Sequence, residues 1–213
     1  DWGLRHFHGH ELSTHRGSSY NAYLIVDEKV ALIDTVWGPF QEKYLDNVRE
    51  LIDPAKVDYV VANHAEPDHS GSLPALMRHC PRATVVVSRR GKESVEGHYH
   101  QAWDWLAVKT GDRLSLGENE LVFIEAPMLH WPDSMFTYLT GRNILMPNDA
   151  FGQHYASDDR FNDEVDEVEK VGVVEAGDKG LKDAALRVLG QRGGGVGADV
   201  GLGLGRLARG QQV

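Results

Sequence analysis

The sequence predicts a layered α/β sandwich built around one hydrophobic core. Short apolar runs, which are typical of strands, alternate along the chain with segments whose apolar residues recur at helical spacing. Tight turns join several pairs of these runs, and this favours hairpins over an all-parallel sheet. At 213 residues the chain is long enough for a sizeable core.

Apolar and β-branched runs with turn residues between them predict the strands. In chain order, we expect strands over residues 20–27, 29–34, 57–62, 83–88, 114–116, 120–127, 136–140 and 143–146. The first two turn at Asp27-Glu28, and the last four form two hairpins. The run 57–62 is short and mainly apolar, which indicates a buried strand.

Three segments have the apolar spacing of amphipathic helices. They cover residues 40–52, 70–79 and 89–98. Pro54 is expected to end the first helix. Ser70 is expected to be the N-cap of the second.

Composition divides the chain into a predicted domain of residues 1–170 and a Gly-rich tail of residues 171–213. All 11 histidines lie at or before His154, whereas 12 of the 23 glycines follow residue 170. No aromatic residue, Pro, Cys or Met follows Phe161. Three interpretations of the tail stay open: a flexible linker, a short amphipathic helix, or translation in a shifted reading frame. The abrupt change in composition favours the last, so we expect the domain to be truncated.

The overall charge and the cysteine content exclude several classes of partner. The chain has 22 basic and 32 acidic residues, a net charge of -10, which argues against nucleic acid or an anionic membrane as the main partner. Apolar runs are short, so we expect neither a transmembrane segment nor a signal peptide. The single cysteine, Cys80, excludes an internal disulfide and a Cys-rich zinc module, and it predicts a reducing, cytoplasmic setting.

One short segment concentrates the residues that could bind metal. Four potential ligands lie within six residues directly after the predicted strand 57–62: His64, Glu66, Asp68 and His69. The carboxyl end of a strand is where α/β proteins often place their sites. Pro67 predicts that the segment is a loop, because proline cannot donate a hydrogen bond to a neighbouring strand.

Two later strands are each followed by another potential ligand, His130 and Asp149. Together with the cluster they provide three imidazoles and three carboxylates, which is more than one ion needs, and this favours a binuclear site. Without thiolates, such a set suits iron or manganese as well as zinc. Taken singly, however, either His130 or Asp149 is more often a cap or a hydrogen-bonding loop residue.

Four segments resemble flavodiiron proteins, also called A-type flavoproteins, which include the rubredoxin:oxygen oxidoreductases. The main one is His-x-Glu-x-Asp-His-Ser-Gly-Ser-Leu-Pro at residues 64–74, and residues 19–24, 128–135 and 148–153 match as well. The resemblance covers about residues 1–168. Ordinary metallo-β-lactamase-like hydrolases have His-x-His-x-Asp-His instead, so Glu66 stands in place of their second His.

This resemblance implies a metallo-β-lactamase-like αββα sandwich that holds two iron ions. It assigns His64, Glu66 and His130 to one iron and Asp68 and His69 to the other. It assigns Asp149 to both irons. It further implies reduction of O2 to water or of NO to N2O, with electrons from rubredoxin or a similar carrier. The FMN of such proteins is bound by a C-terminal flavodoxin-like domain in a head-to-tail homodimer, so we do not expect this chain to bind FMN.

Two parts that the resemblance implies are missing from the sequence. The family has a further His well after the Asp149 position, and no His follows His154; no flavodoxin-like segment is present either. Two alternatives therefore stay open, a binuclear zinc hydrolase, against which Glu66 counts, and an inactive fragment. Trp131 and Tyr138 either shape the pocket or are core aromatics.

Overall fold

The computed structural model describes residues 6–7, 12–15, 17–151 and 156. They divide into two compact units. The described part of the smaller unit runs up to Ser19 and resumes at Asp149, and it contains an antiparallel pair of short strands, β1 (His6–Phe7) and β2 (Leu12–Ser13). The described part of the larger unit comprises residues 20–148, and η3 (Asn148–Phe151) begins at residue 148. The predictions for residues 171–213 lie outside the described residues.

The larger unit contains a five-stranded sheet in the order β3-β4-β5-β6-β7. Its strands are β3 (Tyr23–Val26), β4 (Val30–Ile33), β5 (Tyr59–Ala62), β6 (Thr84–Ser88) and β7 (Trp105–Val108). The β3–β4 pair is antiparallel and the other three pairs are parallel. The carboxyl ends of β4, β5 and β6 therefore lie along one edge of the sheet.

A second sheet is antiparallel throughout and has the order β11-β10-β9-β8. Its strands are β8 (Arg113–Ser115), β9 (Glu120–Glu125), β10 (Met135–Leu139) and β11 (Ile144–Met146). The two hairpins predicted from the sequence are present in it. The strand β7 was not predicted, although its sequence, Trp-Leu-Ala-Val, is a short apolar run like those that predicted other strands.

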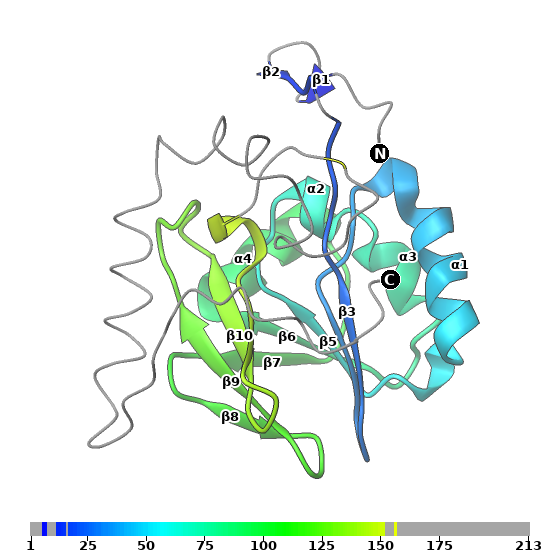
Figure 1. The fold of residues 1–213 in the computed structure, drawn as a ribbon, viewed down its shortest axis with the longest axis vertical. Helices are drawn as coiled ribbons and strands as arrows, with labels where there is room; N and C mark the ends of the chain where they lie inside the picture. Colours follow the sequence, from blue (N-terminus) through cyan, green and yellow to red (C-terminus); the bar gives the residue numbers. More distant parts are fainter. Residues whose placement is uncertain (1–5, 8–11, 16, 152–155, 157–213) are drawn as a thin grey trace. The chain divides into compact units, whose positions relative to one another are not determined.

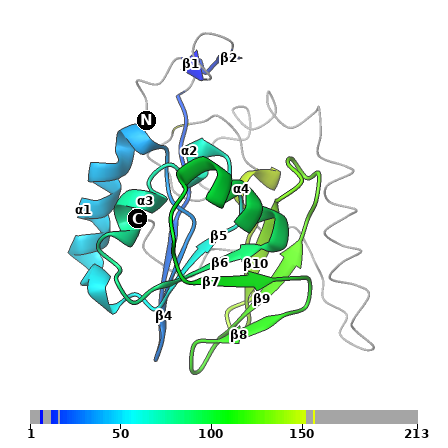
Figure 2. The same cartoon turned by 180° about the vertical axis from the view of Figure 1, so that it is seen from behind.

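Four α-helices and two 3₁₀ turns complete the described part of the larger unit. They are η1 (Gly38–Phe40), α1 (Gln41–Leu51), η2 (Pro54–Lys56), α2 (Pro67–Ser70), α3 (Leu73–Met77) and α4 (Arg89–Tyr99). Figures 1 and 2 show α1 and α3 on one side of the five-stranded sheet and β8 to β10 on the other. Of these helices, none is long and apolar enough to cross a membrane.

Two layers of buried side chains hold this arrangement together. Leu32 of β4 packs with α1 and α3, whereas its neighbours Ala31 and Ile33 pack with Phe123 and Met135 of the second sheet. Both faces of β4 are thus buried, which explains its unbroken apolar run. The predicted α/β sandwich is confirmed. The described residues 20–148 form the layers helix, sheet and sheet, without the second helical layer of an αββα sandwich.

The helix predicted over residues 70–79 is confirmed in part: residues 73–77 are helical, but a single continuous helix from Ser70 is wrong. The structure has α2 ending at Ser70 and a separate α3 beginning at Leu73. A continuous helix is blocked because Pro74 has no N–H to donate to the carbonyl of Ser70. Ser70 is also not an N-cap, since its hydroxyl donates to the Ala65 carbonyl at 2.7 Å.

Candidate metal centre

The segment after β5 is held from its first residue by a buried polar network. The Asn63 backbone and side-chain amides donate to Asp34 at 2.7 and 2.8 Å, and Thr137 donates to Asn63 Oδ1 at 2.7 Å. Asp34, at the end of β4, has a left-handed φ of 61°. Burial raises the pKa of the Asp34 carboxyl, although bonds from Asn148 and Asn63 counteract this. This network fixes the backbone directly before His64.

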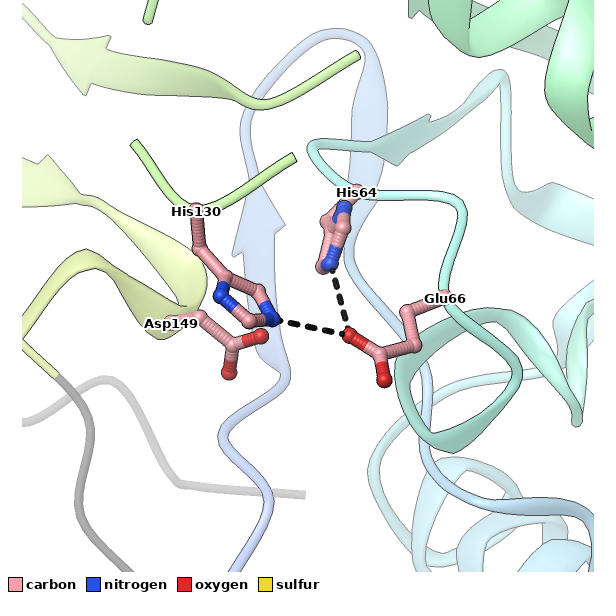
Figure 3. A group of neighbouring side chains, drawn as sticks. All are labelled: His64, Glu66, His130 and Asp149. Atoms are coloured by element: carbon pink, nitrogen blue, oxygen red, sulfur yellow. Dashed lines mark hydrogen bonds and ion pairs between the residues drawn. The ribbon is translucent and has the colours of Figure 1, made fainter. Parts of the chain in front are cut away.

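Three of the predicted ligands converge within the larger unit: His64, Glu66 and His130. Oε2 of Glu66 lies 3.1 Å from His64 Nε2 and 3.2 Å from His130 Nε2. Figure 3 shows both imidazole rings directed at this carboxylate. Ligand atoms of the three residues lie within 4.8 Å of one another.

The electrostatics of this group favour a cation. The hydrogen bond to His64 lowers the pKa of Glu66 to about 2 from its ordinary 4.5, so Glu66 is an anion at neutral pH. His64 and Glu66 are 2% and 5% exposed, whereas the His130 side chain is 56% exposed, so the group opens to solvent on the His130 side. Two imidazoles and a carboxylate form a donor set that fits iron, manganese or zinc.

Asp68 and His69 lie next to this group, on α2. They are buried, and His69 Nε2 lies 3.2 Å from Asp68 Oδ2. The His64 and His69 ring centroids are 5.8 Å apart. In the part of the chain that the structure describes, Asp68 Oδ1 is buried without a hydrogen-bond partner. An orphaned carboxylate oxygen at this position fits a further cation.

The expectation that residues 64–69 form a loop is confirmed for residues 64–66 and wrong for residues 67–69, which lie in α2. Pro67 is the first residue of α2, where a missing backbone N–H costs no helical hydrogen bond. Asp68 and His69 lie in this helical turn and are not among the ligand atoms that lie within 4.8 Å of one another. Asp149 lies in η3 and belongs to the smaller unit, so its role as a ligand remains a prediction from the sequence. His154 lies outside the described residues.

The two aromatic residues proposed to shape the pocket have different surroundings. The Trp131 ring packs edge-on against His64, with 5.3 Å between centroids and 82° between planes. Tyr138 instead donates to Asn143 at 2.8 Å in the turn between β10 and β11. Of these two, only Trp131 contacts a predicted ligand in the described part of the chain.

Asp133, which was not predicted from the sequence, lies on the other side of His64. Asp133 Oδ2 lies 3.1 Å from His64 Nδ1 and accepts a hydrogen bond from the Ala65 amide at 2.7 Å. Burial raises the pKa of Asp133, but the bonds from His64 and Ala65 outweigh it, so the net direction is downward. Its position three residues after His130, within a segment already matched to a metal-binding family, was the available signal.

Sequence comparisons show which known proteins this chain is similar to. Residues 19–173 match the family described as "ODP family beta lactamase". The chain is 54% identical over 167 residues to a nitric oxide reductase of Moorella thermoacetica, and 52% identical over 171 residues to an anaerobic nitric oxide reductase flavorubredoxin homolog of Escherichia coli O157:H7. These matches cover 78% and 79% of this chain but only 42% of either relative.

Comparison with solved structures also identifies similar proteins. The rubredoxin oxygen:oxidoreductase of Desulfovibrio gigas aligns with a TM-score of 0.81 and 37% identity, over 90% of this chain and 50% of that one. The flavodiiron protein of Giardia intestinalis aligns with a TM-score of 0.81 and 38% identity, over 90% of this chain and 48% of that one. The chain thus spans half or less of the length of these four proteins.

Proposed function

Because the chain belongs to the ODP family of beta-lactamase domains and matches flavodiiron proteins along most of its length, we propose that it is the metal-binding part of a flavodiiron-type oxidoreductase. The resemblance inferred from the motifs is confirmed. The proposed activity is reduction of NO to N2O, of O2 to water, or of both. The observation that carries this proposal is the convergence of His64 and His130 on Glu66.

In this proposal the ions are two irons. His64, Glu66 and His130 would hold one iron, and the buried pair Asp68 and His69 supports a place for the other. Asp149 is proposed to bridge them on the strength of its sequence match alone. Two ferrous ions would supply two electrons and open positions where a diatomic molecule binds. The described residues supply the charge: Glu66 is an anion in a buried setting, which favours bound cations.

Electrons would reach this centre from FMN on a part of the protein that this chain does not contain. Complete reduction of O2 needs four electrons, so two ferrous ions need a nearby electron source. We propose a rubredoxin-like carrier as the donor to FMN and a homodimer as the assembly. The names of the relatives, which include a flavorubredoxin and a rubredoxin oxygen:oxidoreductase, support the choice of carrier. A cytoplasmic setting belongs to the same proposal.

Metal analysis of the purified chain after anaerobic loading with ferrous iron tests this proposal. We expect about two irons per chain. We expect a loss of iron in Glu66→Gln, which removes the anionic ligand that faces both His64 and His130. Glu120→Gln is the matched control, because Glu120 is bound to Arg113 away from the ligands. Bound zinc with esterase or lactamase turnover would instead support a hydrolase, and one iron or none would indicate an inactive fragment.

Activity provides a second test. Because the chain lacks the flavin-binding part, we expect no steady NADH- or rubredoxin-driven consumption of NO or O2 by the iron-loaded chain alone. Consumption should begin when a reduced flavoprotein is added, and Glu66→Gln should abolish it. Steady turnover without any flavoprotein would contradict the proposal that the electrons come from an FMN that this chain does not bind.

A further inference from the structure

His64 lies between two carboxylates, one at each ring nitrogen. Nε2 is 3.1 Å from Glu66 Oε2, and Nδ1 is 3.1 Å from Asp133 Oδ2. His64, Glu66 and Asp133 are all buried. A neutral imidazole has one ring proton, so it can donate to only one of these carboxylates.

The two sides of the ring have different surroundings. On the Nε2 side, Glu66 Oε2 is shared with His130 Nε2 at 3.2 Å, so three ligand atoms meet there. On the Nδ1 side, Asp133 Oδ2 is already engaged by the Ala65 amide at 2.7 Å. A cation therefore has its ligands on the Nε2 side, and the ring proton has its acceptor on the Nδ1 side.

We propose that Asp133 is a positioning residue that holds the His64 proton on Nδ1, so that the Nε2 lone pair is left for the metal, and whose negative charge strengthens His64 as a ligand. A carboxylate that accepts the other ring N–H of a ligating histidine fixes its tautomer and orientation and makes it a stronger ligand. This inference rests on the metal centre proposed above.

Asp133 is itself firmly held. Its backbone carbonyl accepts a hydrogen bond from Ser88 Oγ at 2.8 Å, and Ser88 Oγ in turn accepts from the Gly91 amide at the start of α4. The Ala65 amide donates to the Asp133 side chain and fixes it. Trp131 packs against the ring of His64, which the Asp133 carboxylate faces. Asp133 lies in the same loop as His130. Its hydrogen bonds therefore connect that loop both to the first turn of α4 and to the segment that carries His64.

Two substitutions separate the charge of Asp133 from its role as an acceptor. In Asp133→Asn the side-chain carbonyl can still accept from His64 and Ala65, because the amide nitrogen takes the place of Oδ1, which has no hydrogen-bond partner among the described residues. The tautomer should persist while the negative charge is lost. Asp133→Ala removes the acceptor, so no Asp133 carboxylate should then hold the proton on His64 Nδ1 by a hydrogen bond.

The control is Asp58→Asn. Asp58 is a largely buried carboxylate that accepts from the Val30 amide at 2.8 Å and forms ion pairs with Lys29 and Arg82. None of these three partners is a predicted ligand, so Asp58→Asn removes a structural carboxylate of the same kind without touching His64.

The experiment uses the full chain with ¹⁵N-labelled histidine, metal-free and zinc-loaded, together with zinc titrations. The His64 signal is identified by its loss in His64→Gln. We expect an Nδ1–H proton on His64 in the parent, in Asp133→Asn and in Asp58→Asn, and its loss in Asp133→Ala. Zinc affinity should fall about 10- to 100-fold in Asp133→Asn and remain at the parental value in Asp58→Asn.

Binding of zinc through His64 Nδ1 would overturn the inference, as would an affinity in Asp133→Asn within about twofold of the parent. The two proposals fail separately. A parent chain that binds no zinc would refute the metal centre, whereas the metal-free spectrum would still decide whether Asp133 holds the Nδ1 proton. If Asp133→Ala does not fold, the affinities of Asp133→Asn and Asp58→Asn decide the result.

Discussion

At the scale of single residues, Glu66 is the residue that distinguishes the proposed metal centre from that of a hydrolase. In its place, a hydrolase of the same superfamily has a neutral histidine. The carboxylate adds a negative charge to a buried group, and one of its oxygens faces both His64 and His130. More negative ligands offset more cationic charge, which suits ions that cycle to a higher oxidation state.

Asp27, which is distant in sequence from the predicted ligands, connects two turns of the larger unit by hydrogen bonds. Its carboxylate accepts hydrogen bonds from the Asn119 side chain at 2.8 Å and from the amides of Glu28, Asn119 and Glu118. The Asn119 side-chain bond first, and then the backbone bonds, lower the pKa of Asp27 to about 2 from 3.8. The turn after β3 is thereby joined to the loop between β8 and β9.

We predict that Asp27→Asn lowers the Tm by about 2–4 °C at pH 7. Because the folded pKa is depressed, the stabilisation is complete above pH 3.8 and is lost as the pH falls toward 2. The difference in Tm between the parent and Asp27→Asn should therefore shrink over that interval, measured by thermal melts at several pH values. Glu118→Gln, in the same loop, is the control, and an equal loss there would contradict the prediction.

At the scale of elements, the junction between α2 and α3 depends on a close approach of two backbone segments. A Cβ on Gly71 would meet the Pro67 carbonyl oxygen and would lie 2.7 Å from the Gly38 backbone nitrogen. Gly71 itself has ordinary helical dihedral angles, φ -61° and ψ -27°. Space, rather than backbone conformation, therefore requires glycine here.

We predict that Gly71→Ala reduces the free energy of unfolding by about 1–3 kcal/mol, because backbone atoms must shift to admit the methyl group. Gly97→Ala is the matched control. Gly97 lies in α4, and a Cβ added to it would meet no atom within 4 Å, so alanine there should stabilise by about 0.5–1 kcal/mol. Urea unfolding measures both. Equal stabilities for the two variants would refute the steric argument.

The elements also show what periodicity can and cannot predict. Helix α1 was predicted because its apolar residues recur at helical spacing, and the strands of both hairpins were predicted because turn residues separate their short apolar runs. The break between α2 and α3 was missed because Ser70 suits an N-cap locally, while its hydroxyl is used instead by Ala65. Likewise, the density of ligand residues predicted His64 and Glu66. The proposed role of Asp133 depends on a contact between residues 69 positions apart, and only its place in the family-like segment 128–135 pointed to it.

At the scale of the whole larger unit, a buried network joins the two sheets at the ligand end. Thr137 of β10 donates to Asn63 Oδ1, and Asn63 in turn donates to Asp34 at the end of β4. The Met135 amide also donates to the Asn63 carbonyl at 2.9 Å. Asn63 thus connects the second sheet to the residue directly before His64.

We predict that Thr137→Val, which keeps the shape of the side chain, lowers the free energy of unfolding by about 1–3 kcal/mol, because it leaves Asn63 Oδ1 buried without this donor. Thr84→Val on β6 is the control, since Thr84 is half-buried at the start of its strand. Urea unfolding compares the two variants. A loss in Thr84→Val as large as that in Thr137→Val would show that the network adds nothing specific.

At the scale of the whole chain, the family match and the composition change at nearly the same place. The match ends at residue 173, and residues 171–213 contain 12 of the 23 glycines and no histidine. Residues 1–170 have 16 basic and 28 acidic residues, whereas residues 171–213 have 6 and 4. Gly, Ala, Val and Arg, which are frequent in the tail, have GC-rich codons, and a shifted frame in a GC-rich gene favours them.

A shifted reading frame therefore predicts a specific result at the level of DNA. One of the two other frames beyond about codon 170 should encode a segment that contains the missing late histidine, followed by a flavodoxin-like pattern of alternating strands and helices. Sequencing the gene and its transcript and translating all three frames checks this. If neither alternative frame encodes such a segment, the tail is a genuine part of the chain, and its Leu181 to Leu189 stretch becomes the segment to test for helix formation by circular dichroism.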